Sequence, residues 1–223
     1  MNLEQARANM VEQQIRPWEV LDQDVLDLLY AVPREEFVPA QYRNLAFSDL
    51  EIPLGRSPGE AMWAPRIEAR VLQALAVKRT ERVLEVGTGS GYLTALLARR
   101  AAEVVSVEIN PEIARLGRAN LERHGAENVR LEIGDAARGT PPGLPSRAPY
   151  DVIVLTGSVP LLPRAFQESL AAGGRLFAVV GEPPVMSAQL VSCVAPGSLQ
   201  AVALFETVLA PLASCERPSR FRF

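Results

Sequence analysis

The feature that most constrains this chain is a regular alternation, from about residue 65 onward, of short apolar runs with helical stretches. The apolar runs occupy residues 82–86, 104–109, 129–133, 151–155 and 175–180. Strands that alternate with helices of this length predict βαβ units and a mostly parallel sheet, the architecture of an α/β fold. Two further strands within residues 188–208 are expected to pair antiparallel at the sheet edge.

The helix between the second and third runs has clear end signals. Asn110 is a good N-cap, Pro111 suits the first helical position, and Gly125 can end the helix in a left-handed conformation. A helix is also expected from about Tyr92 to Arg100. This part of the chain therefore has the helices that crossover connections require.

The first 60 residues follow a different pattern, which indicates helices joined by loops. Leu3, Met10, Val11 and Ile15 fall near helical spacing, and a second helix is expected to begin near Asp22. The proline-bracketed segment 32–39 predicts a fixed turn or extended piece, and the Pro- and Gly-rich stretches 53–59 and 139–149 predict loops. We expect an N-terminal helical extension with a substrate loop (1–64), a Rossmann-like domain (65–209) and a C-terminal tail (210–223).

Composition excludes several classes of function. The 223 residues carry 23 basic and 26 acidic side chains, a net charge of -3, which argues against nucleic-acid and polybasic membrane partners. No apolar run reaches the roughly 20 residues of a membrane span, and the first residues do not resemble a signal peptide. Cys193 and Cys215 are the only cysteines, which suggests a reducing compartment, so we expect a cytoplasmic protein.

The single histidine, His124, excludes a His-rich metal site, and we expect no bound metal. Its place in the last turn of a helix predicts contact with free carbonyl groups rather than with substrate. Cys193 is expected to be a small core residue and Cys215 a tail residue.

The segment Val83–Tyr92, VLEVGTGSGY, is the most informative stretch. It reads as a buried strand, a turn with three glycines that lets the backbone approach a ligand closely, and a helix. The third glycine comes one residue earlier than in the dinucleotide pattern G-x-G-x-x-G. A Glu85 carboxylate pointing into the pocket would repel a pyrophosphate and suit an amino or sulfonium group, which favours S-adenosylmethionine. Taken alone, the turn is equally consistent with simple strand–helix packing.

Carboxylates at the ends of the next two strands support a nucleoside ligand. Glu108 lies 21 residues after Gly87, about the distance at which an acidic residue binds ribose hydroxyls in dinucleotide-binding folds. Asp135 follows the third strand, where it could accept the exocyclic amine of adenine. The fourth strand, 150–156, ends at the same edge, where open α/β sheets bind ligands.

Short motifs are spread along the chain: MVEQQI (10–15), VPREEFVP (32–39), AFSD (46–49), IPLG (52–55), LEVGTGSGY (84–92), GD (134–135), GGRL (173–176) and VVG (179–181). In these motifs the chain resembles the protein-L-isoaspartate (D-aspartate) O-methyltransferase family. The resemblance extends from about residue 5 to 182.

The family implies a Rossmann-like, class I S-adenosylmethionine-dependent methyltransferase fold with helices on both faces of the sheet. It implies methyl transfer to the α-carboxylate of isoaspartyl residues in damaged proteins, with S-adenosyl-L-methionine as cofactor. The cofactor residues that the resemblance implies are Glu85, Gly87, Gly89, Glu108 and Asp135. We also expect their neighbours Thr88, Ser90, Gly91, Ile109 and Ala136 to contact the cofactor.

The substrate loop departs from the family. Where the family carries Gly-Gln-Thr-Ile-Ser-Gln-Pro, residues 55–65 read GRSPGEAMWAP, with two residues inserted. If Pro65 matches the family proline, Trp63 takes the serine position and Ala61 the threonine position. The candidates for acceptor contact are then Ser57, Glu60 and Trp63, and no catalytic residue is assigned. Residues 155–158 also differ from the family pattern.

Three functions remain open from the sequence. The first is isoaspartyl methylation, whose acceptor is already ionised at neutral pH and needs no general base. The second is methylation of a small molecule, such as a small carboxylic acid, or of a different peptide, with Met62 and Trp63 forming an apolar pocket. The third is S-adenosylmethionine binding without turnover. Glu85 and the glycine spacing disfavour a dinucleotide oxidoreductase.

Overall fold

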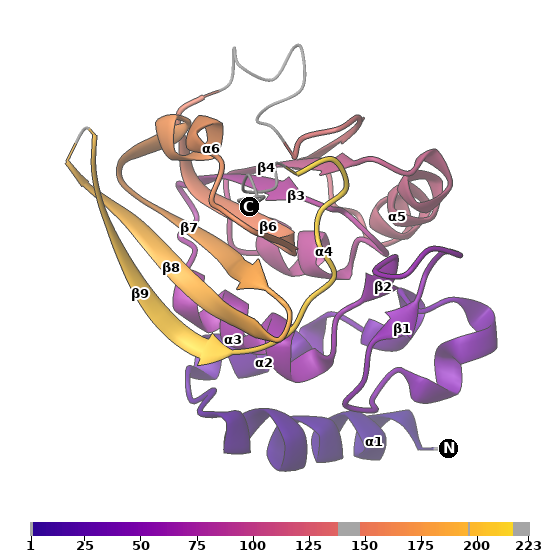
Figure 1. The fold of residues 1–223 in the computed structure, drawn as a ribbon. Helices are drawn as coiled ribbons and strands as arrows, with labels where there is room; N and C mark the ends of the chain where they lie inside the picture. The colour runs from indigo at the N-terminus through magenta and orange to yellow at the C-terminus, as the bar shows by residue number, and fades with distance from the viewer. Residues whose placement is uncertain (1, 138–147, 196, 216–223) are drawn as a thin grey trace.

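The structure, a computed structural model, describes residues 2–137, 148–195 and 197–215. Its centre is a seven-stranded sheet in the order β5-β4-β3-β6-β7-β8-β9 (Figure 1). The strands are β3 (Arg82–Val86), β4 (Glu103–Glu108), β5 (Val129–Ile133), β6 (Tyr150–Val159), β7 (Leu170–Glu182), β8 (Val185–Ala195) and β9 (Ser198–Glu206). The first five of these pair in parallel, and β7–β8 and β8–β9 pair antiparallel, which confirms the α/β prediction.

Six α-helices are described: α1 (Leu3–Met10), α2 (Gln23–Ala31), α3 (Pro65–Leu75), α4 (Tyr92–Ala98), α5 (Pro111–Arg123) and α6 (Arg164–Glu168). Asp22 caps α2 and Asn110 caps α5 through their side-chain oxygens, and Gly125 has a positive φ of 64°, as the sequence predicts. α4 ends two residues before the expected Arg100. The proline-bracketed segment forms a short 3₁₀ helix, Arg34–Glu36, which follows the extended Pro33.

Residues of opposite parity on the central strands point to different faces of the sheet. Val83, Val104 and Val152 join one hydrophobic cluster with side chains from α1 to α5, whereas Leu84 and Val105 belong to a second cluster that includes Phe166 of α6. The N-terminal helices lie below the sheet in Figure 1 and share the first cluster. The N-terminal extension is therefore part of the main core of the molecule.

A short antiparallel pair, β1 (Ile52–Pro53) with β2 (Ala61–Met62), flanks the loop that the sequence predicts at 53–59. It places residues 54–60 beside the carboxyl ends of the parallel strands. Of the second predicted loop, 139–149, residues 139–147 lie outside the described part, as do 216–223 of the predicted tail. Among the described residues, every helix is too short or too polar to cross a bilayer.

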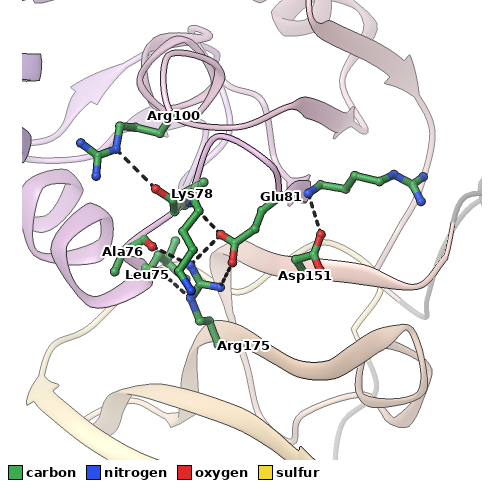
Figure 2. Close-up of polar contacts among 9 residues, drawn as sticks. Leu75, Ala76, Lys78, Glu81, Arg100, Asp151 and Arg175 are labelled. Carbon is green, nitrogen blue, oxygen red and sulfur yellow. Dashed lines mark hydrogen bonds and ion pairs between the residues drawn. The ribbon is translucent and has the colours of Figure 1, made fainter.

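The opposite end of the sheet is fastened by a polar network around Arg175 (Figure 2). The Arg175 guanidinium donates to the Leu75 and Ala76 carbonyls at the end of α3 and to both carboxylate oxygens of Glu81. Glu81 also accepts the Lys78 N–H at 2.7 Å. This network joins α3, β3 and β7 at the end of the sheet away from the site described next.

Candidate functional site

A cavity of about 430 Å³ opens at the carboxyl ends of β3, β4 and β6. The strand order reverses there, because β3 pairs with β4 on one side and with β6 on the other. Open α/β sheets bind ligands at this point. The cavity is walled by the glycine turn after β3, the ends of β4 and β5, the loop 57–63, Thr156–Gly157 and the segment 209–213.

The turn between β3 and α4 lets the backbone approach a ligand. Gly87, Gly89 and Gly91 all have positive φ values, of 101°, 56° and 82°. A side chain at Gly91 would meet the Gly117 carbonyl at 3.0 Å, whereas a Cβ on Gly89 would meet Leu54 alone at 3.3 Å. Gly91 thus permits close packing on α5, and Gly89 leaves its face of the turn open to the cavity.

Glu108, at the end of β4, is fixed against the turn. Its Oε2 accepts the Gly89 N–H at 3.0 Å and its Oε1 accepts the Asn110 N–H at 3.0 Å. It is 6% exposed and lines the cavity. A carboxylate has about four acceptor positions, so this one can still accept hydroxyl groups from a ligand.

The remaining predicted residues on the β4 and β5 side also meet at the cavity. Ile109, Asp135 and Ala136 line it, with Ile109 half-exposed, Asp135 exposed and Ala136 buried. Asp135 Oδ1 accepts the Ala137 N–H at 3.0 Å, which directs the carboxylate back along its own loop.

The structure does not place Glu85 as the sequence suggests, because its carboxylate does not line the cavity. Glu85 is fully buried, and its Oε2 accepts hydrogen bonds from Thr94 (2.5 Å) and Ser106 (2.6 Å). Burial raises the pKa of Glu85 to about 7, against the opposing effect of these two hydrogen bonds. Side chains alternate along a strand, so Glu85 shares with Val83 the face of the sheet that α1 to α5 cover, and it supports the turn from behind.

The loop residues occupy three different environments. Ser57 is exposed at the rim of the cavity, and its N–H donates to Glu60 Oε2 at 2.9 Å. Glu60 Oε1 accepts from the Asn110 side chain at 2.7 Å, and these two hydrogen bonds hold the pKa of Glu60 below its usual value. Trp63 is 7% exposed, packs edge-on against Phe177 and still lines the cavity.

Two acidic residues of the cavity wall were not identified from the sequence, the exposed Glu51 and the buried Glu68. Glu68, on α3, is 2% exposed and lines the cavity. Its Oε2 forms a short ion pair with the buried Arg34, which also donates to the Trp63 carbonyl at 2.5 Å. The apolar spacing of α3 includes position 68 on its buried face, but a partner 34 residues away leaves no signal in local periodicity.

The segment 209–213 is a second part of the site that sequence reasoning did not assign. Ser158 N–H donates to the Ala210 carbonyl, Leu212 N–H donates to the Ser158 carbonyl, and Ser158 Oγ donates to the Leu209 carbonyl, each at 2.9 Å. A Cβ on Gly157 would lie 2.8 Å from the Leu212 side chain. The unusual sequence at 155–158 therefore fits the close approach of this segment, which covers part of the cavity.

His124 and the cysteines lie apart from the cavity lining. His124 stacks on Phe37 with ring centres 4.6 Å apart, and its Nε2 lies 3.1 Å from Glu36 Oε2. The His124 side chain therefore contacts an aromatic ring and a carboxylate instead of the helix carbonyls that the sequence predicts. Cys193 is buried in the core, as predicted, and Cys215 is partly buried.

The chain matches the family model described as protein-L-isoaspartate (D-aspartate) O-methyltransferase over residues 5–216. It is 43% identical over 175 residues to the protein-L-isoaspartate O-methyltransferase of Methanoculleus marisnigri, covering 78% of this chain and 77% of the relative. It is 39% identical over 208 residues to the enzyme of that name from Koribacter versatilis, covering 92% of this chain and 90% of the relative.

Two solved structures share the fold over almost the whole chain. One is a candidate protein-L-isoaspartate O-methyltransferase from Plasmodium falciparum, in complex with S-adenosyl-L-homocysteine. It has a TM-score of 0.77 at 20% identity and covers 95% of this chain and 98% of that one. A second structure, a protein-L-isoaspartate O-methyltransferase, has a TM-score of 0.74 at 27% identity and covers 93% of this chain and 65% of that one.

Proposed function

Because the chain belongs to the protein-L-isoaspartate (D-aspartate) O-methyltransferase family, it is an S-adenosylmethionine-dependent methyltransferase of isoaspartyl residues, and we propose that the cavity described above is its active site. The observation that carries this placement is the fixed Glu108 carboxylate beside the open face of the glycine turn. That pair of features lies where α/β sheets of this type bind nucleosides.

We propose that different parts of the cavity contact different parts of the cofactor. Glu108 accepts the ribose hydroxyls, Ile109 packs against the base, and Asp135 with Ala136 contacts the adenine edge. The glycine turn lies along the rest of the cofactor. Glu85 supports that turn from behind, through Ser106 and Thr88, rather than touching the ligand. Eight of the ten predicted cofactor residues line the cavity and form the proposed contact set, namely Gly87, Thr88, Gly89, Ser90, Glu108, Ile109, Asp135 and Ala136; Glu85 and Gly91 do not line it.

The charges of the cavity fit this cofactor. Five carboxylates line it, and among the described lining residues there is no Lys, Arg or His. Those carboxylates are Glu51, Glu60, Glu68, Glu108 and Asp135. S-adenosylmethionine carries a sulfonium and an ammonium group, and opposite charges attract strongly where water is partly excluded. The sulfonium supplies an activated methyl group, which is the chemistry that the cofactor brings to the site.

The protein has mainly to orient the acceptor and exclude water. A carboxylate with a pKa near 4 is already the nucleophile at neutral pH, so no side chain needs to take a proton from it. We propose that Ser57 and Trp63 contact the acceptor from the loop side. Glu60 holds the loop to α5 through Asn110, since both of its oxygens are hydrogen-bonded.

The cofactor assignment is tested by thermal unfolding with S-adenosylhomocysteine and with NAD. A ligand that binds the native state stabilises it by about 2.7 kcal/mol at a hundredfold excess over its Kd. S-adenosylhomocysteine is expected to raise Tm, and NAD is expected to leave it unchanged. An equal rise with NAD would show that the site accepts a pyrophosphate and would refute the assignment.

We further propose that proteins bearing isoaspartyl residues, rather than small carboxylic acids or nucleic acids, are the natural partners, and that the enzyme acts in the cytoplasm. The net charge of -3 and the open cavity support a peptide acceptor without a nucleic-acid surface. Initial rates with an isoaspartyl peptide and a panel of small acids separate these acceptors. Faster turnover of a small acid at matched concentration would favour the alternative.

A further inference from the structure

Glu68 presents a carboxylate to the cavity while the positive partner that neutralises it remains hidden. Arg34 is 1% exposed and is absent from the cavity lining, whereas Glu68 lines it. Besides its ion pair, Arg34 donates to the Ala46 carbonyl at 2.9 Å and to the Trp63 carbonyl at 2.5 Å, and its guanidinium lies 4.9 Å from the centre of the Tyr92 ring. A ligand in the cavity therefore meets the acid and not the base.

One carboxylate oxygen of Glu68 is free to accept a hydrogen bond from a ligand. Arg34 occupies Glu68 Oε2, and Glu68 Oε1 receives no hydrogen bond from the described residues. The nearby Glu85 adds a second negative group, and burial together with that charge raises the pKa of Glu68, against the opposing charge of Arg34. A cationic N–H donor at Oε1 would stabilise the ionised Glu68 carboxylate through both its charge and a hydrogen bond.

The position of Glu68 relative to the nucleoside contacts indicates which part of the cofactor it meets. Glu108 and Asp135 follow β4 and β5, on one side of β3 in the sheet. Glu68 comes from α3 and lines the cavity with Met62 and Trp63, together with Leu93 of α4. With the adenosine half against β4 and β5, the amino-acid half extends along the glycine turn toward α3.

We propose that Glu68, held in place by Arg34, binds the α-ammonium group of the cofactor's amino-acid half through Oε1. This inference rests on the proposed active site and assigns to Glu68 the role of cation partner that the sequence alone suggests for Glu85. Because Arg34 also holds the Trp63 carbonyl, the same buried pair links the cofactor's amino-acid end to the substrate loop.

The test uses calorimetric binding of three ligands to the full-length protein. S-adenosylmethionine and S-adenosylhomocysteine carry the amino-acid half, and 5′-methylthioadenosine lacks it. Glu68→Gln keeps the shape and an oxygen for Arg34 but removes the charge. We expect the Kd of both amino-acid-bearing ligands to rise about tenfold or more, the effect of losing a charge-assisted hydrogen bond. The Kd of 5′-methylthioadenosine should not change.

Glu35→Gln is the matched control, since it removes a buried carboxylate that is also paired with an arginine, Arg7, but lies outside the cavity lining. It should leave all three affinities unchanged. Equal weakening of all three ligands in Glu68→Gln would indicate a structural role and overturn the proposal. Unchanged affinities with a raised KM for the isoaspartyl peptide would place Glu68 against the acceptor and overturn it too. If the wild type binds none of the three ligands, the proposed active site itself fails.

Discussion

Glu108 places one carboxylate between the glycine turn and the proposed ribose position. Both of its oxygens already accept backbone N–H groups, from Gly89 and Asn110, so it fixes the turn as well as binding the ligand. A pre-oriented acceptor needs no rearrangement when the cofactor arrives, which reduces the entropic cost of binding.

We expect Glu108→Ala to weaken S-adenosylhomocysteine binding by about one to two orders of magnitude, because charge-assisted hydrogen bonds to the ribose are lost. Glu103→Ala, at the other end of the same strand, is the control and should bind normally. Calorimetry gives both affinities. An unchanged Kd for Glu108→Ala would make Glu108 an ordinary strand end.

Single residues show where sequence reasoning reaches its limit. The number of residues between Gly87 and Glu108 is set by one helix and the strand that follows it, so the place of Glu108 at the strand end could be predicted from the sequence. The face of the sheet to which Glu85 points depends on how the helices pack on β3. Glu85 lies two residues after Val83, so the sequence does indicate that these two side chains share a face. Glu68 could not be assigned, because its partner Arg34 is brought to it only by tertiary packing.

At the scale of elements, the Arg175 network in Figure 2 fastens α3, β3 and β7. We expect Arg175→Leu to lower the free energy of unfolding by about 3 kcal/mol, since it leaves a largely buried Glu81 and two carbonyls without their donor. Arg164→Leu, which removes an exposed i,i+4 pair with Glu168, should cost less than about 0.5 kcal/mol. Urea unfolding measures both. An equal loss of unfolding free energy in the two variants would show that the Arg175 network contributes no more to stability than an exposed ion pair.

The same network predicts a dependence on pH. Burial alone would raise the pKa of Glu81, but the Arg175 and Lys78 hydrogen bonds and charges hold it below its usual value. Because the pKa of Glu81 is lower in the folded state, its ionised form stabilises the protein at pH values above the unfolded-state pKa of about 4.3. This stabilisation is lost as the pH falls through the folded-state pKa. The Tm difference between wild type and Glu81→Gln should therefore shrink below about pH 4. A difference that grows in acid would contradict this.

The segment 209–213 offers a second test on elements. Gly157→Val should displace it, because even a Cβ there lies 2.8 Å from Leu212. We expect an overpacking cost of about 1–3 kcal/mol and a rise in the Kd of S-adenosylhomocysteine, since Leu212 lines the cavity. A destabilised variant with normal cofactor affinity would show that this wall does not contribute to binding.

Element types were predictable because the hydrophobic periods differ, 3.6 for helices and 2 for strands. Capping residues such as Asp22 and Asn110 also marked helix starts well. The strands β6 and β7 run several residues beyond their apolar cores, to Val159 and from Leu170, because they continue through register shifts and polar residues that periodicity does not report. The return of 209–212 to Ser158 is a long-range pairing with no local signal.

At the scale of the whole molecule, the altered loop 55–65 is set into an otherwise typical family fold. The separation into an extension, a domain and a tail stays a prediction, although α1 to α3 share one core with the sheet. Hydroxyl groups that could orient a carboxylate are replaced by Ala61 and Trp63. Small misplacements of a reacting group cost rate steeply.

We therefore expect kcat/KM for an isoaspartyl peptide to lie at least about tenfold below that of a family member with the Thr-Ile-Ser stretch. Steady-state kinetics on the two enzymes under one set of conditions measures the ratio. A ratio near one would show that the loop change is neutral and that backbone groups orient the acceptor.

The function is tested most directly by transfer of a labelled methyl group from S-adenosylmethionine to two peptides that differ only in an isoaspartyl or an aspartyl linkage. We expect base-labile methyl ester on the isoaspartyl peptide and none above background on the aspartyl peptide. Equal labelling of both peptides, or no labelling by a protein that binds S-adenosylhomocysteine, would contradict this function.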